Sequence, residues 1–156
     1  MATDVDYITA VHEAGHALVG ACYGYDVKCA VVHVTNSRQD EGGRVELHDW
    51  NGERDANPNR FLVYVLAGAA AERHATGHYS SRDAADREYA ATLCAVYLNA
   101  DITSDAVRKE MDIADTLARA MMHDDDLWRW IERVSKALTK RRRLTGRDIH
   151  ELREAR

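Results

Sequence analysis

Apolar residues recur every three or four positions along most of the chain, a spacing typical of helices that turn one face toward a core. Near the N-terminus, a stripe of this kind consists of Ile8, Val11, Gly15, Leu18, Val19 and Cys22. Thr3 and Asp6 have the spacing of an N-terminal capping box, and Gly24 can take the left-handed conformation that ends a helix. We therefore expect a first helix from about Asp4 to Tyr23.

Two short segments after this helix have the pattern of strands. Residues 29–35 are rich in apolar and β-branched side chains, and residues 43–48 alternate between polar and apolar ones. Residues 36–42 and 48–57 are polar and contain turn-forming residues, which predicts loops. The expected β element has two or three strands and needs helices against one face to be stable.

The remaining chain predicts helices. Asn57 and Pro58 have the order of an N-cap and a first helical residue, and the run from Phe61 to Ala71 is apolar all round, which is typical of a buried helix. Thr145 and Asp148 form a second capping box, which opens a short terminal helix. Further helices are expected over residues 83–98, 107–121 and 127–138. The fold class is mainly α with a small β element, in a single domain over residues 1–156.

Composition narrows the range of partners. The net charge is −5, with acidic and basic residues interspersed, so we expect no nucleic-acid surface. Cys22, Cys29 and Cys94 lack CxxC spacing and are expected to be small buried residues in a reducing compartment. There is no signal-peptide pattern, and the longest apolar run, residues 61–71, is too short to cross a bilayer. These features predict a cytoplasmic protein without membrane insertion.

The first predicted helix contains the sequence His12-Glu13-Ala14-Gly15-His16. Residues four apart lie on the same face of a helix, so His12 and His16 can direct imidazole nitrogens at one metal ion. Glu13 lies one step round the helix, where its carboxylate can take a proton from an attacking water. HExxH on a helix therefore predicts a zinc hydrolase. Gly15 lowers helix stability by roughly 1 kcal/mol relative to alanine, which suggests that another element packs closely there.

Zinc in a hydrolase requires a third protein ligand. The candidates outside the first helix are His33, His48, His74, His78, Glu72, Asp83 and Asp86. Local sequence spacing does not choose among them.

A family resemblance selects one of these candidates as the third ligand. The segments that carry it are Leu66-Ala67-Gly68-Ala69-Ala70-Ala71-Glu72, then Gly77-His78-Tyr79-Ser80-Ser81 with Asp86 and Ala90, and finally Leu138 to Ile149. Together with HEAGH, they resemble the peptidase domain of the FtsH family (peptidase family M41). That family is a largely helical zinc-metallopeptidase domain, normally attached to an AAA ATPase and assembled as a hexamer.

The resemblance implies a ligand set and a reaction. His12, His16 and Asp86 would bind Zn²⁺, and Glu13 would be the general base. The strand near Val31 to Thr35 resembles the family's edge strand, to which an extended peptide could pair. Substrates would be peptides or unfolded proteins, and oligomerisation is possible. The chain contains no GxxxxGK[ST] sequence, so any ATPase would be a separate partner.

The chain departs from the family pattern near the third ligand. Arg82 and Asp83 stand where the family has Gly-Ala, which makes Asp83 a second candidate ligand. Ala69 replaces a usual arginine and Arg73 a usual glutamate, so a polar contact of the family is expected to be missing.

Two other functions are compatible with these residues. The first is a catalytically silent module that holds a peptide on the edge strand. The second is a structural zinc site, in which His33, His78 or Asp83 supplies a fourth ligand. An intact Glu13 favours the hydrolase, because a pure binding module does not need that carboxylate.

Overall fold

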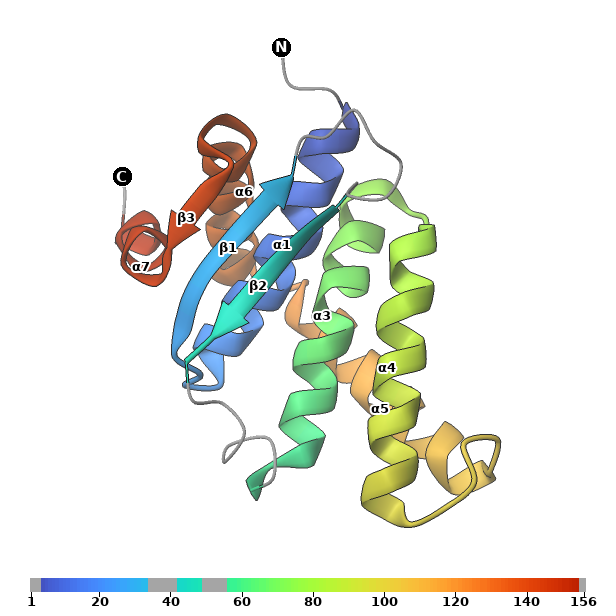
Figure 1. Cartoon of the computed structure of the whole chain (residues 1–156). Coiled ribbons are helices and arrows are strands. Elements are labelled where there is room, and N and C mark those ends of the chain that lie inside the picture. The colour runs from blue at the N-terminus through green and yellow to red at the C-terminus, as the bar shows by residue number, and fades with distance from the viewer. Residues whose placement is uncertain (1–3, 34–41, 49–55, 155–156) are drawn as a thin grey trace.

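The computed structural model describes residues 4–33, 42–48 and 56–154. The fold is mainly helical with a small antiparallel sheet, as the sequence predicts (Figure 1). Its elements in chain order are α1 (Asp4–Cys22), β1 (Val27–His33), β2 (Gly42–Leu47), α3 (Pro58–Thr76), α4 (Ser81–Leu98), α5 (Asp105–Met121), α6 (Asp125–Arg141), β3 (Arg143–Thr145) and α7 (Gly146–Glu154). Among these described residues, no helix is both long and apolar enough to cross a membrane.

Helix α1 is the central element of the fold. It packs mainly against α3, α6 and β1, and in Figure 1 the sheet lies in front of α1. Residues from Thr9 to Gly20 are all buried, so the helix is enclosed rather than amphipathic. The apolar stripe did not predict this, because His12, Glu13 and His16 form a polar face that other polar groups cover. Cys22, predicted to be buried, is exposed, whereas Cys29 and Cys94 are buried.

Close packing of α1 on α3 explains the glycine between the two histidines. A Cβ atom at Gly15 would lie 2.7 Å from both the carbonyl oxygen of Ala67 and the Cβ of Ala71. Such a distance is well inside van der Waals contact, so only glycine fits without movement of the backbone. The prediction of a closely packed neighbour at Gly15 is confirmed, and the contact brings both histidines against α3.

The sheet has the strand order β2-β1-β3, which corrects one expectation. The segment from Val31 to Thr35 was expected at a sheet edge, but β1 is the central strand and pairs with β3 from Cys29 to Val31. Val34 and Thr35 lie outside the described residues. Val31 is paired with Arg143 on one side and with Arg44 on the other. Strand β3 forms the edge of the sheet next to β1. It has only three residues, too few for an alternating pattern in the sequence to predict it.

Caps define where the helices begin. Ser80 and Asp83 form a capping box, so α4 begins at Ser81, two residues before the predicted start. The box of Thr145 and Asp148 is present at the start of α7, as predicted. Asn57 precedes α3, but its side chain makes no capping hydrogen bond. Thr3 lies outside the described residues, so the first predicted capping box is not described.

Candidate metal centre

Three side-chain donors from two helices face a common point. His12 Nε2 and His16 Nε2 on α1 lie 3.1 Å apart. Asp86 Oδ2, from the first turns of α4, lies 2.9 Å from His12 Nε2 and 3.1 Å from His16 Nε2. Ligands at zinc bond lengths in a tetrahedral site are about 3.3 Å apart, so these separations suit one zinc ion. The structure thus brings together the three residues expected to bind the metal.

Gly68 of α3 forms the floor of this site. A Cβ atom at Gly68 would lie 2.7 Å from His12 Nε2 and even closer to His16 Nε2. Glycine is therefore the residue that leaves space at the two nitrogens. The donor set and this space together fit a small cation.

The other nitrogen of each histidine is held by α3. His12 Nδ1 donates to Glu72 Oε2 at 3.1 Å, and His16 Nδ1 donates to the carbonyl oxygen of Tyr64 at 2.9 Å. A donor at Nδ1 leaves Nε2 as the metal-binding nitrogen, and such partners fix both the tautomer and the ring orientation. Sequence reasoning proposed Glu72 only as a candidate ligand and did not single out Tyr64.

Asp83 occupies the Nδ1 side of His12, away from the three converging donors. Its Oδ1 lies 3.5 Å from His12 Nδ1. The remaining candidates for a third or fourth ligand are exposed, namely His33, His48, His74 and His78. Among the described residues, no further His, Cys, Asp or Glu joins the group of His12, His16 and Asp86. Asp86 is therefore the candidate third ligand.

Buried negative charge surrounds the two histidines. Glu13, Glu72 and Asp83 are buried, and Asp86 is partly buried. Burial opposes charge on His12, but the facing carboxylates of Asp83, Asp86 and Glu72 raise its pKa well above the ordinary value. Burial likewise opposes ionisation of Asp86, yet the two histidines hold its pKa well below the usual range. A site of this charge stabilises cations.

Glu13 lies beside the donors and faces β2. The residue is 5% exposed. A Cβ atom at Gly43 of β2 would lie 2.8 Å from Glu13 Cδ, so the carboxyl group is packed against that strand. Burial raises the pKa of Glu13, while the nearby His16 and His12 lower it. The net rise makes this carboxylate a stronger base than an exposed one.

No known protein family matches the chain in a comparison with family sequence profiles, and no curated protein matches it. Any proposal of function therefore rests mainly on the geometry of the site.

A groove leads from the candidate metal centre along β2. A pocket of about 210 Å³ is lined by Glu13, His16 and Asp86 together with residues of β2, α3 and α4. A second hollow of about 390 Å³ shares Val45, Tyr64 and Tyr89 with it. The second hollow is otherwise lined by Lys28, Glu46, Leu47 and Phe61. Tyr89 lies one helical turn after Asp86, a signal that could have placed it near the site.

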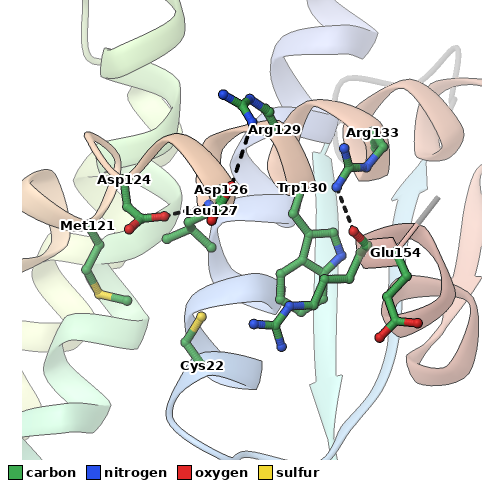
Figure 2. A pocket seen from close by; sticks show the side chains of 10 residues that line it. Cys22, Met121, Asp124, Asp126, Leu127, Arg129, Trp130, Arg133 and Glu154 are labelled. Carbon is green, nitrogen blue, oxygen red and sulfur yellow. Dashed lines mark hydrogen bonds and ion pairs between the residues drawn. The ribbon is translucent and has the colours of Figure 1, made fainter. Parts of the chain in front are cut away.

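A roomier pocket lies in another part of the molecule. It has a volume of about 650 Å³ and is lined by residues of α1, α6 and α7, including Cys22, Trp130 and Arg153 (Figure 2). Asp124 caps α6 and Arg133 donates to the carbonyl oxygen of Leu152, so both have structural roles. Neither of the close ligand groups found among the described residues lies in this pocket. Among the described residues, the candidate metal centre therefore lies in the smaller pocket.

Proposed function

We propose that this protein is a zinc-dependent metallopeptidase of the HExxH type that hydrolyses peptide bonds in peptides or unfolded proteins. The observation that carries the proposal is the convergence of His12 Nε2, His16 Nε2 and Asp86 Oδ2 beside the buried carboxyl group of Glu13. The resemblance of HEAGH and the Leu66–Glu72 and Gly77–Asp86 segments to the FtsH-family peptidase domain supports the same ligand set.

His12, His16 and Asp86 would hold the zinc ion, and Gly68 leaves the space for it. Bound zinc supplies Lewis acidity, which polarises a carbonyl group and brings the pKa of water to about 7. Two imidazoles with one carboxylate are an ordinary ligand set for catalytic zinc. The absence of a fourth ligand among the described residues favours a catalytic site over a structural one.

Glu13 would act as general base and then as general acid. Its carboxylate takes a proton from the attacking water and passes that proton to the nitrogen of the leaving amine. The raised pKa of Glu13 suits both steps, because a group whose pKa lies closer to neutral pH both accepts and releases a proton more readily. Glu72 and the carbonyl group of Tyr64 hold the two histidines in fixed orientations throughout.

The substrate backbone would pair with β2. Among the described strands, β2 pairs only with β1, and the groove from the metal centre runs along β2 past Val45 and Leu47. An extended peptide can add to such an edge by backbone hydrogen bonds. Phe61, Tyr64 and Leu47 in the second hollow favour an apolar substrate side chain.

A peptide-binding module that does not cut is the second candidate function. The groove along β2 would hold a peptide in either case, so only catalysis by Glu13 distinguishes the binding module from a peptidase. The cysteine usage suggests a cytoplasmic location. The resemblance suggests a separate ATPase that delivers unfolded chains, and assembly into an oligomer.

Cleavage of an unfolded protein substrate by a Glu13→Gln variant tests the proposal. Loss of a general base typically costs 10²- to 10⁴-fold in rate, so we expect turnover to fall by about that factor while zinc stays bound. Glu88→Gln, on an exposed position of α4, is the matched control and should cleave like the unchanged protein. Equal cleavage by the Glu13→Gln variant would contradict the proposed mechanism, and zinc binding without any cleavage by the unchanged protein would favour the binding module.

A further inference from the structure

The helix that carries the third ligand has little direct packing on the helix that carries the other two. Helix α4 packs mainly on α3 and α5, whereas α1 packs mainly on α3, α6 and β1. Polar side chains connect α4 with α1. Arg82 Nη1 donates to Thr9 Oγ1, Asp83 Oδ1 faces His12 Nδ1, and Asp86 meets both histidines.

These three residues share one face of α4. Arg82 and Asp83 precede Asp86 by four and three positions, the spacings that place helical side chains next to one another. This face is directed at α1, since each of the three contacts a residue of that helix. The side chains at positions 82 and 83 therefore determine where the first turns of α4 rest on α1.

The two carboxylate oxygens of Asp83 face different groups. Oδ2 accepts the backbone N–H of Ser80 at 2.6 Å and closes the capping box of α4. Oδ1 is buried, makes no hydrogen bond within the usual limits and lies 3.5 Å from His12 Nδ1. The residue is 1% exposed, and burial of a carboxylate costs several kcal/mol unless it is paired. The cap alone does not require Oδ1 to face a metal-binding histidine.

Arg82 links the same groups from the other side. Besides Thr9, its guanidinium group lies 3.7 Å from Glu72 Oε1, and Glu72 Oε2 accepts from His12 Nδ1. Arg82 thus spans α4, α1 and α3 around one imidazole ring.

We propose that Arg82 and Asp83 are positioning residues that fix the start of α4 on α1 and so set the affinity of the site for zinc. The inference rests on the proposed zinc site, but it concerns residues that do not touch the metal. It also assigns a role to the two positions at which the chain departs from the Gly-Ala of the resembled family.

Zinc affinity, measured by competition with a chromogenic chelator, tests this proposal. Loss of a group that orients a metal ligand typically weakens affinity 10- to 100-fold, and we expect a decrease of about that size for Asp83→Asn. The amide oxygen of asparagine can still accept the N–H of Ser80, so the cap is retained. Thr9→Val removes the acceptor for Arg82 without changing any charge, and we expect weaker zinc binding from it as well.

A Ser104→Ala variant separates positioning from simple stability. It removes the N-cap of α5, a helix that carries none of the candidate ligands, so the melting temperature of the metal-free protein should fall while zinc affinity stays unchanged. Co²⁺ in place of zinc gives a second readout, because its visible absorption bands report the geometry of the ligands. We expect these bands to change in Asp83→Asn and to persist in Ser104→Ala.

Unchanged zinc affinity in both Asp83→Asn and Thr9→Val would overturn the inference and leave the proposed function intact. The inference would also be overturned if Ser104→Ala weakened zinc binding as much as Asp83→Asn, because stability alone would then explain the loss. Failure of the unchanged protein to bind zinc would overturn the proposed function together with the inference.

Discussion

Gly68 is the residue whose size controls access to the histidine nitrogens. In Gly68→Ala, the added methyl group would lie 2.7 Å from His12 Nε2, in the space that the metal requires. Alanine is favoured over glycine in a helix by about 1 kcal/mol, so α3 itself should form as before. We expect zinc affinity to fall by at least about tenfold with helical content retained, measured by chelator competition and circular dichroism.

Gly43→Ala adds the same methyl group on the other side of the site. There it would lie 2.8 Å from Glu13 Cδ and 2.5 Å from the carbonyl oxygen of Val31, rather than against the candidate metal ligands. The expected result is retained zinc binding with slower cleavage. Equal zinc affinity of Gly68→Ala and Gly43→Ala would contradict the role assigned to Gly68.

Titration of His12 makes the metal-free protein sensitive to pH. Burial lowers the pKa of His12, but the facing carboxylates of Asp83, Asp86 and Glu72 outweigh it and raise this pKa well above 6.5. Its contribution to stability is therefore complete below about pH 6.5 and is lost as the pH rises through the higher folded value. Urea unfolding in the presence of a chelator should show stability falling above about pH 6.5. Zinc should reverse the trend, because only deprotonated histidine binds metal. Metal-free stability that rises over this interval would contradict the assignment.

Residue-level prediction from the sequence reached the candidate ligands within one helix and little beyond it. HExxH singled out His12, Glu13 and His16 because their spacing on a helix is fixed by local geometry. Asp86 required the family resemblance, since a distance of 70 positions from His16 is not constrained by helix spacing. The roles of Tyr64 and Asp83 were missed because each depends on the way α3 and α4 pack around α1.

At the scale of elements, the contact between α1 and α3 is the one most sensitive to side-chain size. Gly15→Ala would place a Cβ atom 2.7 Å from the carbonyl oxygen of Ala67, which belongs to backbone and cannot rotate away. Overpacking of this kind costs about 1–3 kcal/mol and exceeds the gain in helix propensity. Urea unfolding should therefore show a less stable protein.

Gly20→Ala in the same helix is the matched control. Its Cβ atom would meet the ring of Tyr64 at 3.2 Å, a side chain that can shift. We expect a smaller loss of stability than in Gly15→Ala. A Gly15→Ala protein more stable than the starting chain would show that α1 and α3 are not packed as closely as described.

The sequence predicted element boundaries well where a single local residue determines them. The predicted end of the first helix before Gly24 agrees with α1 to within one residue, because a glycine with φ of 81° follows it. Strand order could not be predicted, since the three-residue β3 has no periodic signal and its pairing with β1 depends on the docking of α6 and α7. The expectation that β1 lies at an edge came from the family resemblance.

In the whole molecule, the candidate metal centre lies where helices from later in the chain meet α1. Helix α1 lies at the centre of the fold, and α3 and α4 bring Gly68, Glu72 and Asp86 to its polar face. Zinc held by α1 and α4 would connect two helices that otherwise meet mainly through polar side chains. Metal binding and the arrangement of α4 should therefore depend on each other.

Zinc content of the purified protein, beside that of an Asp86→Ala variant, tests the central claim most directly. Elemental analysis after zinc loading and removal of free metal should give about one zinc per chain for the unchanged protein, because three donors converge on one point. The variant should lose most of this zinc while keeping its helical content. Full retention of zinc by Asp86→Ala, or no zinc in the unchanged protein, would contradict the account.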